Sequence, residues 1–369
     1  MSWLRVGLLA CFGVLVLNLL PAWRTGLGPT RQPVPGAQLP RQFGQPVYAP
    51  AQNPPERRAF ELGRQLFYDA RLSADGTVSC GSCHQQARAF ASPERLSQGV
   101  GGRPGLRNAP ALQNLRWRRT FFADGGPKHL ETLPLAPLTN PREMGTTLPA
   151  VLAKLNADSA YARQFAAVYG QRPISSYQLL RALAQFTAAL TSASSRYDYH
   201  VRRAAGGRFT APERRGQALF RAKCGSCHAT ELFTDGSFRN NGLNRRFGQD
   251  SGRVVVTFLP TDRGRFAVPS LRNVARTAPY MHDGRFGTLA QVLAHYDHGM
   301  VASPTLDPIF RGPNGRLGIP LTAAEQRALL AFLATLTDEA FCRAPEFAAP
   351  RPSPGGKVRA AVRQPGIAP

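Results

Sequence analysis

The same five-residue pattern occurs twice in this chain, and it constrains the fold and chemistry more than any other feature. In each copy a cysteine, a glycine, a serine and a second cysteine are followed by a histidine, at residues 80–84 and 224–228. Two thiols at this spacing can reach the two vinyl groups of one haem, and the histidine can supply the proximal iron ligand. We therefore expect two covalently bound c-type haems. The attachment residues are Cys80, Cys83, Cys224 and Cys227, and the expected iron ligands are His84 and His228.

Other uses of a cysteine pair fit this pattern less well. A zinc site normally takes four ligands from paired knuckles, but Cys80 and Cys224 lie 144 residues apart. A thioredoxin-type redox pair needs no histidine after the second cysteine, and neither does a structural disulfide. The haem interpretation is the one that uses all three residues of each pattern.

The first 23 residues predict export. A nearly continuous apolar run extends from Leu4 to Leu20, with Arg5 near its start. Such a segment is typical of a signal peptide or an uncleaved membrane anchor, and it is shorter than most membrane spans. Because haem attachment of this type takes place outside the cytoplasmic membrane, we expect a periplasmic or cell-envelope protein, with this segment as a potential membrane tether.

The chain is strongly basic, with 46 Lys and Arg against 22 Asp and Glu and a formal net charge of +24. The basic residues are spread along the whole chain, without a Lys/Arg block or an aromatic-interleaved motif, so no nucleic-acid partner is expected. A surface of this charge favours an acidic protein partner.

Composition predicts a helical body between two irregular ends. Residues 24–55 are rich in Pro, Gly, Gln and Arg, which predicts a linker, and residues 343–369 predict a flexible tail. Between them, capping residues followed three positions later by an acid predict helix starts, and apolar residues recur at helical spacing. The capping pairs are Asn53 with Glu56, Thr210 with Glu213, and Thr322 with Glu325; the apolar runs are residues 179–190 and 329–336. Only residues 253–258 alternate as a strand does, so we expect an all-α fold.

Landmarks around the two cysteine patterns also repeat. Glu-Arg-Arg, a glycine, a leucine and a phenylalanine precede each pattern, within residues 56–67 and 213–220. After each pattern, Pro, Leu, Asn and Asp-Gly recur with identical spacing, within residues 110–125 and 269–284. Two matched sets in the same order predict two tandem cytochrome c-like domains, each with one haem, over residues 56–205 and 206–342.

On these residues the chain resembles the bacterial di-haem cytochrome c peroxidases, together with the related di-haem oxidase MauG. The resemblance runs from about Glu56 to Leu336. Its most specific stretches are residues 62–69 (LGRQLFYD), 105–110 (GLRNAP), 141–145 (PREMG), 269–274 (PSLRNV) and 278–284 (APYMHDG). In that family the N-terminal haem binds peroxide and the C-terminal haem passes electrons to it. The resemblance implies hydrogen peroxide as the substrate and a small cytochrome c or cupredoxin as the electron donor.

The resemblance also places the acid–base group that moves a proton between the peroxide oxygens at Glu143. His129, near the Asp-Gly turn, is an alternative base. Three positions depart from the peroxidase pattern. Val100 stands where the family has a histidine that caps the peroxidatic haem, so this haem is expected to be open without reductive activation. Ala123 replaces the tryptophan between the haems, and Leu133 replaces a glutamine of the distal pocket; Trp117 is more simply a buried packing residue than a substitute for the missing aromatic.

The far ligand of the second haem is a methionine in peroxidases, and the matching position here is Tyr296, which resembles the MauG arrangement. A phenolate favours ferric iron, whereas a methionine raises the potential. The neighbouring His295, His298 and Met300 remain alternatives.

The family further binds calcium between its domains. The matching oxygen donors are the side chain of Asn108 and the carbonyls of Thr277 and Pro279, as a hard cation prefers. His282 matches a family histidine near the domain interface, for which a structural role and an electron-path role both stay open.

The resemblance thus implies a di-haem cytochrome c peroxidase that reduces hydrogen peroxide to water. One alternative is a MauG-like oxidase that uses peroxide to oxidise a protein or organic substrate; Val100 and Tyr296 support it and Ala123 weighs against it. The other is a non-enzymatic carrier of electrons with two haems. Val100 disfavours the carrier, because pure electron transfer usually keeps both irons six-coordinate.

Overall fold

A computed structural model describes residues 34–48 and 53–351 of the chain. The predicted signal peptide or anchor at residues 1–23 lies outside these ranges. Within them, no helix combines the length and the apolar character that crossing a membrane requires.

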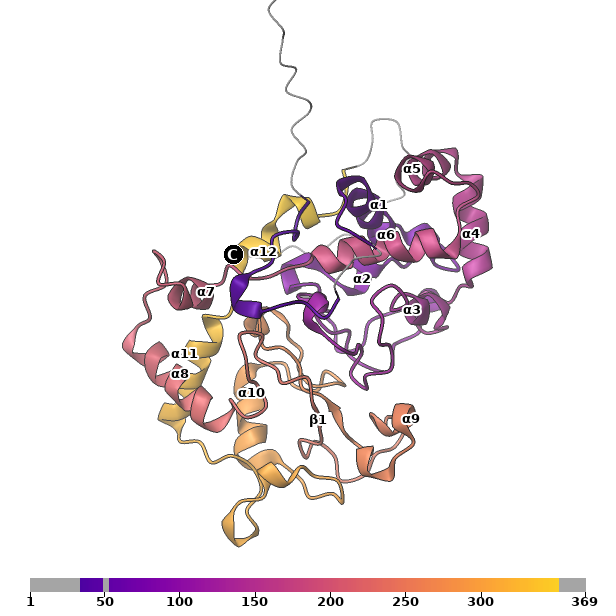
Figure 1. Ribbon diagram of the computed structural model, residues 1–369. Helices are drawn as coiled ribbons and strands as arrows, with labels where there is room; N and C mark the ends of the chain where they lie inside the picture. The colour runs from indigo at the N-terminus through magenta and orange to yellow at the C-terminus, as the bar shows by residue number, and fades with distance from the viewer. Residues whose placement is uncertain (1–33, 49–52, 352–369) are drawn as a thin grey trace, which may run out of the picture. The chain divides into compact units, whose positions relative to one another are not determined.

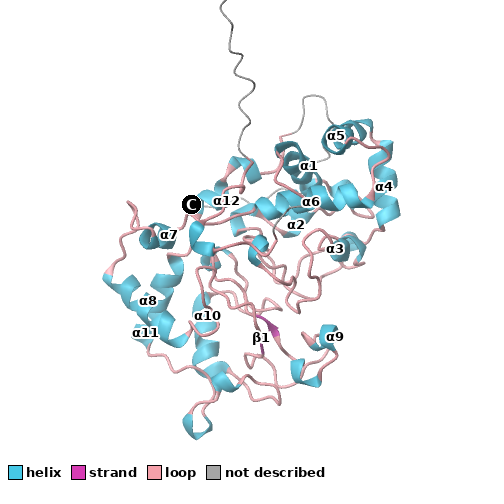
Figure 2. Ribbon diagram, viewed as in Figure 1, coloured by secondary structure: helices cyan, strands magenta, loops and turns pink. Residues whose placement is uncertain are grey.

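The described chain is mostly helix and loop, which confirms the predominantly helical prediction (Figure 2). Its α-helices are α1 (Arg57–Tyr68), α2 (Cys80–Cys83), α3 (Leu135–Thr139), α4 (Leu148–Ala157), α5 (Ser159–Tyr169), α6 (Ser176–Ala189), α7 (Arg196–Val201), α8 (Ala211–Lys223), α9 (Val254–Thr257), α10 (Leu289–Ala294), α11 (Ala323–Ala334) and α12 (Glu339–Arg343). A π-helical turn, His295–Gly299, continues α10. The strands β1 (Phe238–Arg239) and β2 (Phe266–Ala267) form one antiparallel pair, with Phe238 opposite Ala267.

Each half of the chain packs the helix before its cysteine pattern against a later helix. In Figure 1, α8 lies alongside α11, and α1 packs with α6 in the other half. Both crossings are close because a glycine stands at the contact. A Cβ atom on Gly63 of α1 would lie 1.9 Å from the carbonyl oxygen of Ala182, and one on Gly216 of α8 would lie 1.9 Å from that of Ala328. The glycine of the sequence repeat therefore serves the same packing role twice.

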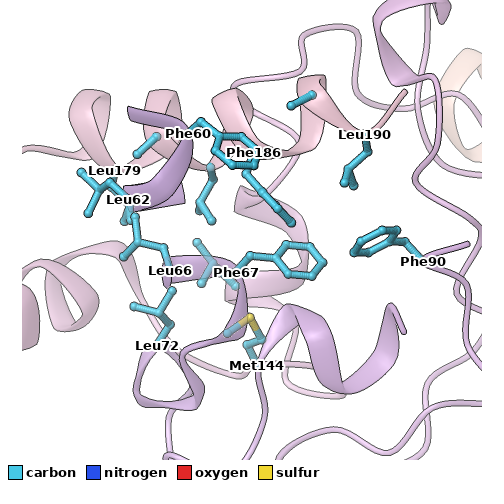
Figure 3. Packing of buried hydrophobic residues seen from close by; sticks show 14 of the residues in the cluster. Phe60, Leu62, Leu66, Phe67, Leu72, Phe90, Met144, Leu179, Phe186 and Leu190 are labelled. Atoms are coloured by element: carbon cyan, nitrogen blue, oxygen red, sulfur yellow. The ribbon is translucent and has the colours of Figure 1, made fainter. Parts of the chain in front are cut away.

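Each of these helix pairs contributes residues to a large hydrophobic cluster. The first contains Phe60, Phe67 and Phe186, and the ring centroids of Phe67 and Phe186 lie 4.9 Å apart (Figure 3). The second is built from residues between Tyr197 and Leu336. Aromatic and aliphatic side chains at helical spacing thus bury one face of each helix.

The C-terminal segment returns to the first cluster. Phe341, Cys342 and Phe347 are buried there, and the Tyr68 hydroxyl donates a 2.8 Å hydrogen bond to the carbonyl of Phe347. The segment predicted as a flexible tail from residue 343 therefore packs on the body as far as Phe347, because the cluster covers the aromatic ring of that residue.

The described part of the predicted linker also packs on the body. Phe43 and Trp117 form an edge-to-face pair at 5.2 Å, and the Trp117 indole N–H donates to the carbonyl of Gly44 at 3.1 Å. Trp117 is 8% exposed. This residue has the packing role that the sequence favoured.

Helix capping follows the sequence in two of three cases. Thr210 with Glu213 and Thr322 with Glu325 form the predicted capping boxes. The third prediction was wrong, because Glu56 itself caps α1 and accepts from the amides of Arg58 and Ala59. Residues 253–258 were expected to alternate as a strand but contain the short helix α9, held by hydrogen bonds within the turn.

The two halves meet through a symmetric pair of main-chain hydrogen bonds. The amide of Asn108 donates to the carbonyl of His282 at 2.9 Å, and the amide of Ala267 donates to the carbonyl of Ala123 at 2.7 Å. Pro110 and Pro269, the matched landmarks of the repeat, are offset by 159 positions. The same offset relates Asn108 to Ala267 and Ala123 to His282, so each half offers equivalent positions to the other.

Candidate functional site

One cavity of about 1320 Å³ contains both cysteine patterns on its wall. Its other lining residues come from both halves of the chain and are largely apolar, including Leu112, Leu115 and Leu183 from the first half and Leu271, Leu329 and Leu333 from the second. A site for one small molecule typically measures about 300–1,000 Å³. The larger volume, with two attachment patterns on the wall, suits more than one bound group.

The two histidines are oriented alike. Nδ1 of His84 lies 2.8 Å from the carbonyl oxygen of Phe90, and Nδ1 of His228 lies 3.0 Å from that of Phe233. With Nδ1–H donating to the carbonyl, Nε2 of each ring keeps its lone pair for a metal. Burial lowers the pKa of both imidazoles, which favours the neutral, metal-binding form.

The turns that supply these carbonyls are unusual in both halves. Phe90 has a φ of 63° and Phe233 a φ of 56°, a left-handed conformation that is costly for a bulky residue. Both halves therefore adopt a costly backbone conformation at the residue whose carbonyl contacts the histidine. This indicates that holding the histidine ring in place matters in both halves. Sequence reasoning missed these turns, since nothing in their composition predicts a positive φ.

The four patterned cysteines also face the cavity and are free of disulfides. Burial raises the pKa of Cys80 to about 12 and that of Cys224 to about 11, so these thiols stay protonated at neutral pH. Two thiols and a fixed imidazole beside an apolar wall match what a covalently attached haem requires, and the residues present fit that group at both patterns.

Glu143 lies on the cavity wall together with the first pattern. Burial raises the pKa of its carboxyl group, and a hydrogen bond from Asn140 lowers it by less. Nδ2 of Asn140 donates to Oε1 of Glu143 at 2.7 Å, which fixes one carboxylate oxygen and leaves Oε2 for a proton. The backbone of Glu143 is held as well, because its carbonyl accepts from the amide of Val100 at 2.8 Å.

The positions that depart from the peroxidase pattern divide into two groups. Ala123 and Leu133 line the cavity, so both replace a larger or polar side chain there by an apolar one. Val100 is 8% exposed and belongs to the first hydrophobic cluster, not to this cavity wall. His129 is exposed and lies away from the cavity, which removes the structural basis for its role as an alternative base.

Tyr296 lines the cavity from the π-helical turn after α10. Such turns redirect a side chain within a helix and are frequent at functional sites. Burial raises the pKa of its phenol, while a hydrogen bond with the Asn241 side chain lowers it by less. The carbonyl of Tyr296 accepts from the amide of Ile319 at 2.6 Å, which anchors the turn.

The three alternatives to Tyr296 are directed elsewhere. His295 is buried, and its Nε2 lies 3.0 Å from the carbonyl oxygen of Asn241. The His298 side chain is 69% exposed and pairs with Asp297. Met300 packs in a small cluster with Leu306 and Phe310. Tyr296 is the member of this group that contributes to the cavity wall.

The residues expected to bind calcium all line the cavity. Nδ2 of Asn108 donates to the carbonyls of Glu94 and Arg95, at 2.9 and 3.4 Å. Its Oδ1 accepts no hydrogen bond within the described chain and keeps its lone pairs, as a calcium ligand would. His282 lines the cavity too, with its ring stacked on Phe266 at 3.7 Å between centroids.

Among the polar residues on the cavity wall that sequence reasoning missed are Asn140, Asn241 and Arg118. Asn140 stands next to the Pro-Arg-Glu-Met-Gly stretch, and that proximity was the one available signal. Asn241 lies in the loop after β1, and Arg118 is one of many arginines in a basic chain, so neither could be singled out.

Comparisons with known proteins agree with this geometry. A family model described as di-haem cytochrome c peroxidase matches residues 57–206. MauG of Methylorubrum extorquens is 35% identical over 310 residues, which cover 82% of this chain and 85% of that protein. This chain belongs to the di-haem cytochrome c peroxidase and MauG family. Members of the family carry covalently bound haems and act on peroxide.

The family includes peroxidases as well as MauG. The cytochrome c peroxidase Ccp of Escherichia coli is 36% identical over 259 residues, covering 68% of this chain and 55% of that protein. A solved MauG-like protein associated with microbial copper homeostasis superposes with a TM-score of 0.76 and 36% identity, covering 85% of this chain and 98% of that one. The solved structure of the dihaem peroxidase BthA of Burkholderia thailandensis superposes with a TM-score of 0.66 and 28% sequence identity. The match covers 81% of this chain and 92% of that one. Because the chain is similar to both peroxidases and MauG-type proteins, its specific role has to be argued from the residues of the site.

Proposed function

We propose that the protein is a di-haem peroxidase that reduces hydrogen peroxide to water at the haem attached to Cys80 and Cys83. The observation that carries the proposal is Glu143 on the same cavity wall as that pattern, with a raised pKa and one oxygen fixed by Asn140. A carboxyl group with a raised pKa holds an accepted proton more firmly than an ordinary glutamate does, which suits a group that takes up a proton and then passes it on.

The haem supplies the iron that binds the peroxide and takes up its oxidising equivalents. The residues of this chain do the rest. His84 is held by the carbonyl of Phe90 and keeps Nε2 toward the cavity. Oε2 of Glu143 accepts the proton from the inner peroxide oxygen and returns it to the outer oxygen, which leaves as water. Val100 packs in the first hydrophobic cluster instead of facing the cavity, so the side chain at this position does not have to be displaced before peroxide binds.

A second haem would be held by Cys224, Cys227 and His228, with Tyr296 on the cavity wall able to bind its iron, and it would supply the route by which electrons enter. The donor is a small acidic cytochrome c or cupredoxin in the periplasm or cell envelope, because the net charge of +24 attracts an acidic protein at long range. Two tandem cytochrome c-like domains, with a calcium ion at Asn108, Thr277 and Pro279, complete the proposed arrangement.

A second candidate is a peroxide-dependent oxidase of a protein or organic substrate. The presence of Tyr296 on the cavity wall favours it, since a phenolate would make the second haem a poor high-potential donor. The identity to MauG supports the same candidate.

The test is steady-state, peroxide-dependent oxidation of a reduced small acidic cytochrome c by the haem-loaded protein, without pre-reduction. Rapid turnover supports the peroxidase. Negligible turnover with both haems intact, while peroxide still changes the haem spectrum, favours the oxidase. A protein whose spectrum shows no high-spin ferric haem and no response to peroxide is an electron carrier, and both enzyme proposals fail.

A further inference from the structure

Five lysine or arginine side chains of the described chain line the cavity, and four of them have protein partners. Those four are Arg107 with Asp124 and Asp250, Arg142 with the carbonyl of Pro104, Lys223 with Glu325, and Arg239 with Asp235 and Asp307. The fifth is Arg118. Its guanidinium forms no hydrogen bond or ion pair with any part of the chain that the structure describes.

The sequence excludes a missing side-chain carboxylate as the partner of Arg118. The segments outside the described ranges, residues 1–33, 49–52 and 352–369, contain no Asp or Glu. Burial lowers the pKa of Arg118, and no acidic group opposes that effect. Arg118 is partly exposed and lines the cavity. A bound group that fills the cavity would exclude water from this charge, and because an unpaired charge away from water is costly, that group is expected to carry a negative charge near Arg118.

The position of Arg118 places it with the first cysteine pattern. The chain runs along the cavity wall from Pro110, whose carbonyl hydrogen-bonds with the His84 ring, past Leu112 and Leu115 to Arg118. In the second half the repeat offset of 159 puts Thr277 at the equivalent position. Thr277 also lines the cavity, but it is uncharged and its hydroxyl donates to the carbonyl of Val274.

We propose that the guanidinium of Arg118 binds a propionate of the haem attached to Cys80 and Cys83. Each haem carries two propionates, and the planar guanidinium matches a carboxylate through two parallel hydrogen bonds. The inference rests on a haem at the first pattern and not on the peroxide reaction. It makes the two halves unequal, since a propionate is neutralised at the first haem and the equivalent position at the second is a threonine.

Arg118→Gln in the haem-loaded protein tests the inference through the midpoint potential of each haem, measured by spectroelectrochemical titration. The potential of the first haem is expected to fall, because a propionate without its counter-charge stabilises ferric iron. The potential of the second haem should stay unchanged. The two haems are assigned from a Cys80→Ala/Cys83→Ala variant, which retains the second haem alone.

Arg119→Gln is the matched control. Arg119 is the adjacent residue and is exposed, so the same loss of charge should leave both potentials unchanged. Arg118→Lys retains the charge without the two parallel hydrogen bonds, and the fall should be smaller than in Arg118→Gln. The propionate bending bands in the resonance Raman spectrum should shift in both Arg118 variants, which gives a second readout if Arg118→Gln lowers the haem content.

An unchanged first-haem potential together with unchanged propionate bands would overturn the inference, and so would equal shifts in Arg118→Gln and Arg119→Gln. Neither readout requires peroxide turnover. A protein that shows both shifts but does not consume peroxide would therefore reject the proposed peroxidase function and retain the role of Arg118.

Discussion

The guanidinium of Arg272 forms two hydrogen bonds of 2.9 Å with the carboxylate of Asp198. Both side chains are almost wholly buried, at 0% and 1% exposure, and the guanidinium also lies 4.4 Å from the ring centroid of Phe43. The pair joins α7 to the loop that follows β2. Removing one partner would leave the other charge buried without compensation.

Replacing Asp198 by Asn should therefore lower the free energy of unfolding by about 3–5 kcal/mol. Chemical denaturation of the haem-loaded protein measures this change. Arg276→Gln is the control, because Arg276 pairs with Glu339 while both are more than 40% exposed, and an exposed pair is worth about 0–1 kcal/mol. An equal decrease in the free energy of unfolding of the two variants would show that the buried pair stabilises the protein no more than the exposed pair does.

Glu143→Gln should reduce peroxide turnover by about 10²–10⁴-fold, because the amide cannot take up the proton. Haem content and the visible spectrum should match those of the unmodified protein. Glu94→Gln serves as the control, since Glu94 is exposed and does not line the cavity. Full turnover by the Glu143 variant would remove this residue from the mechanism.

Asn140→Leu should move the acid limb of the pH profile of kcat/KM for peroxide to higher pH. Burial raises the pKa of Glu143, and the hydrogen bond from Asn140 opposes this by stabilising the ionised form. Since ionised Glu143 must accept the first proton, activity falls as the pH drops through its pKa. Losing a hydrogen bond to a charged group, worth about 1.5–3 kcal/mol, corresponds to a rise of about one to two pH units. An acid limb at the same pH in both proteins would mean that another group controls it.

Tyr296→Met should raise the midpoint potential of the second haem by on the order of a few hundred millivolts, within the ~0.8 V range that axial ligands span. A thioether favours ferrous iron more than a phenolate does. Met300→Leu provides the comparison, because Met300 is buried in the small cluster with Leu306 and Phe310 and does not line the cavity, so its replacement should leave the potential unchanged. A changed potential in Met300→Leu, with an unchanged potential in Tyr296→Met, would instead identify Met300 as the ligand.

Gly63→Ala and Gly216→Ala should each lower the free energy of unfolding by about 1–3 kcal/mol, because the added Cβ collides with a carbonyl oxygen of the partner helix. Helix propensity alone has the opposite sign and favours alanine by about 1 kcal/mol. Gly248→Ala, where a Cβ meets nothing within 4 Å, should change stability little. Stabilisation in the two helix variants would indicate that the crossings are looser than described.

The sequence could predict the features that depend on local spacing. The two Cys-x-x-Cys-His patterns, the capping boxes at Thr210 and Thr322, and the helical character of the chain required no knowledge of distant contacts. Features set by packing between remote segments could not be predicted in this way. The burial of Phe347 against α1 is one example, and the hydrogen bond that holds Glu143 through Asn140 is another. Arg118 shows the same limit, since its lack of a partner within the described residues is visible only once the paired residues have been placed.

The hydrogen bonds that join Asn108 to His282 and Ala267 to Ala123 use main-chain atoms alone. Each half contacts the other through its own equivalent positions, as the two subunits of an isologous dimer do. The junction therefore holds whichever side chain stands at position 123 or 282, and here it accommodates an alanine on one side and a histidine on the other. Substitutions at these two positions can therefore change the chemistry of the side chains between the halves while the main-chain hydrogen bonds that join the halves are retained.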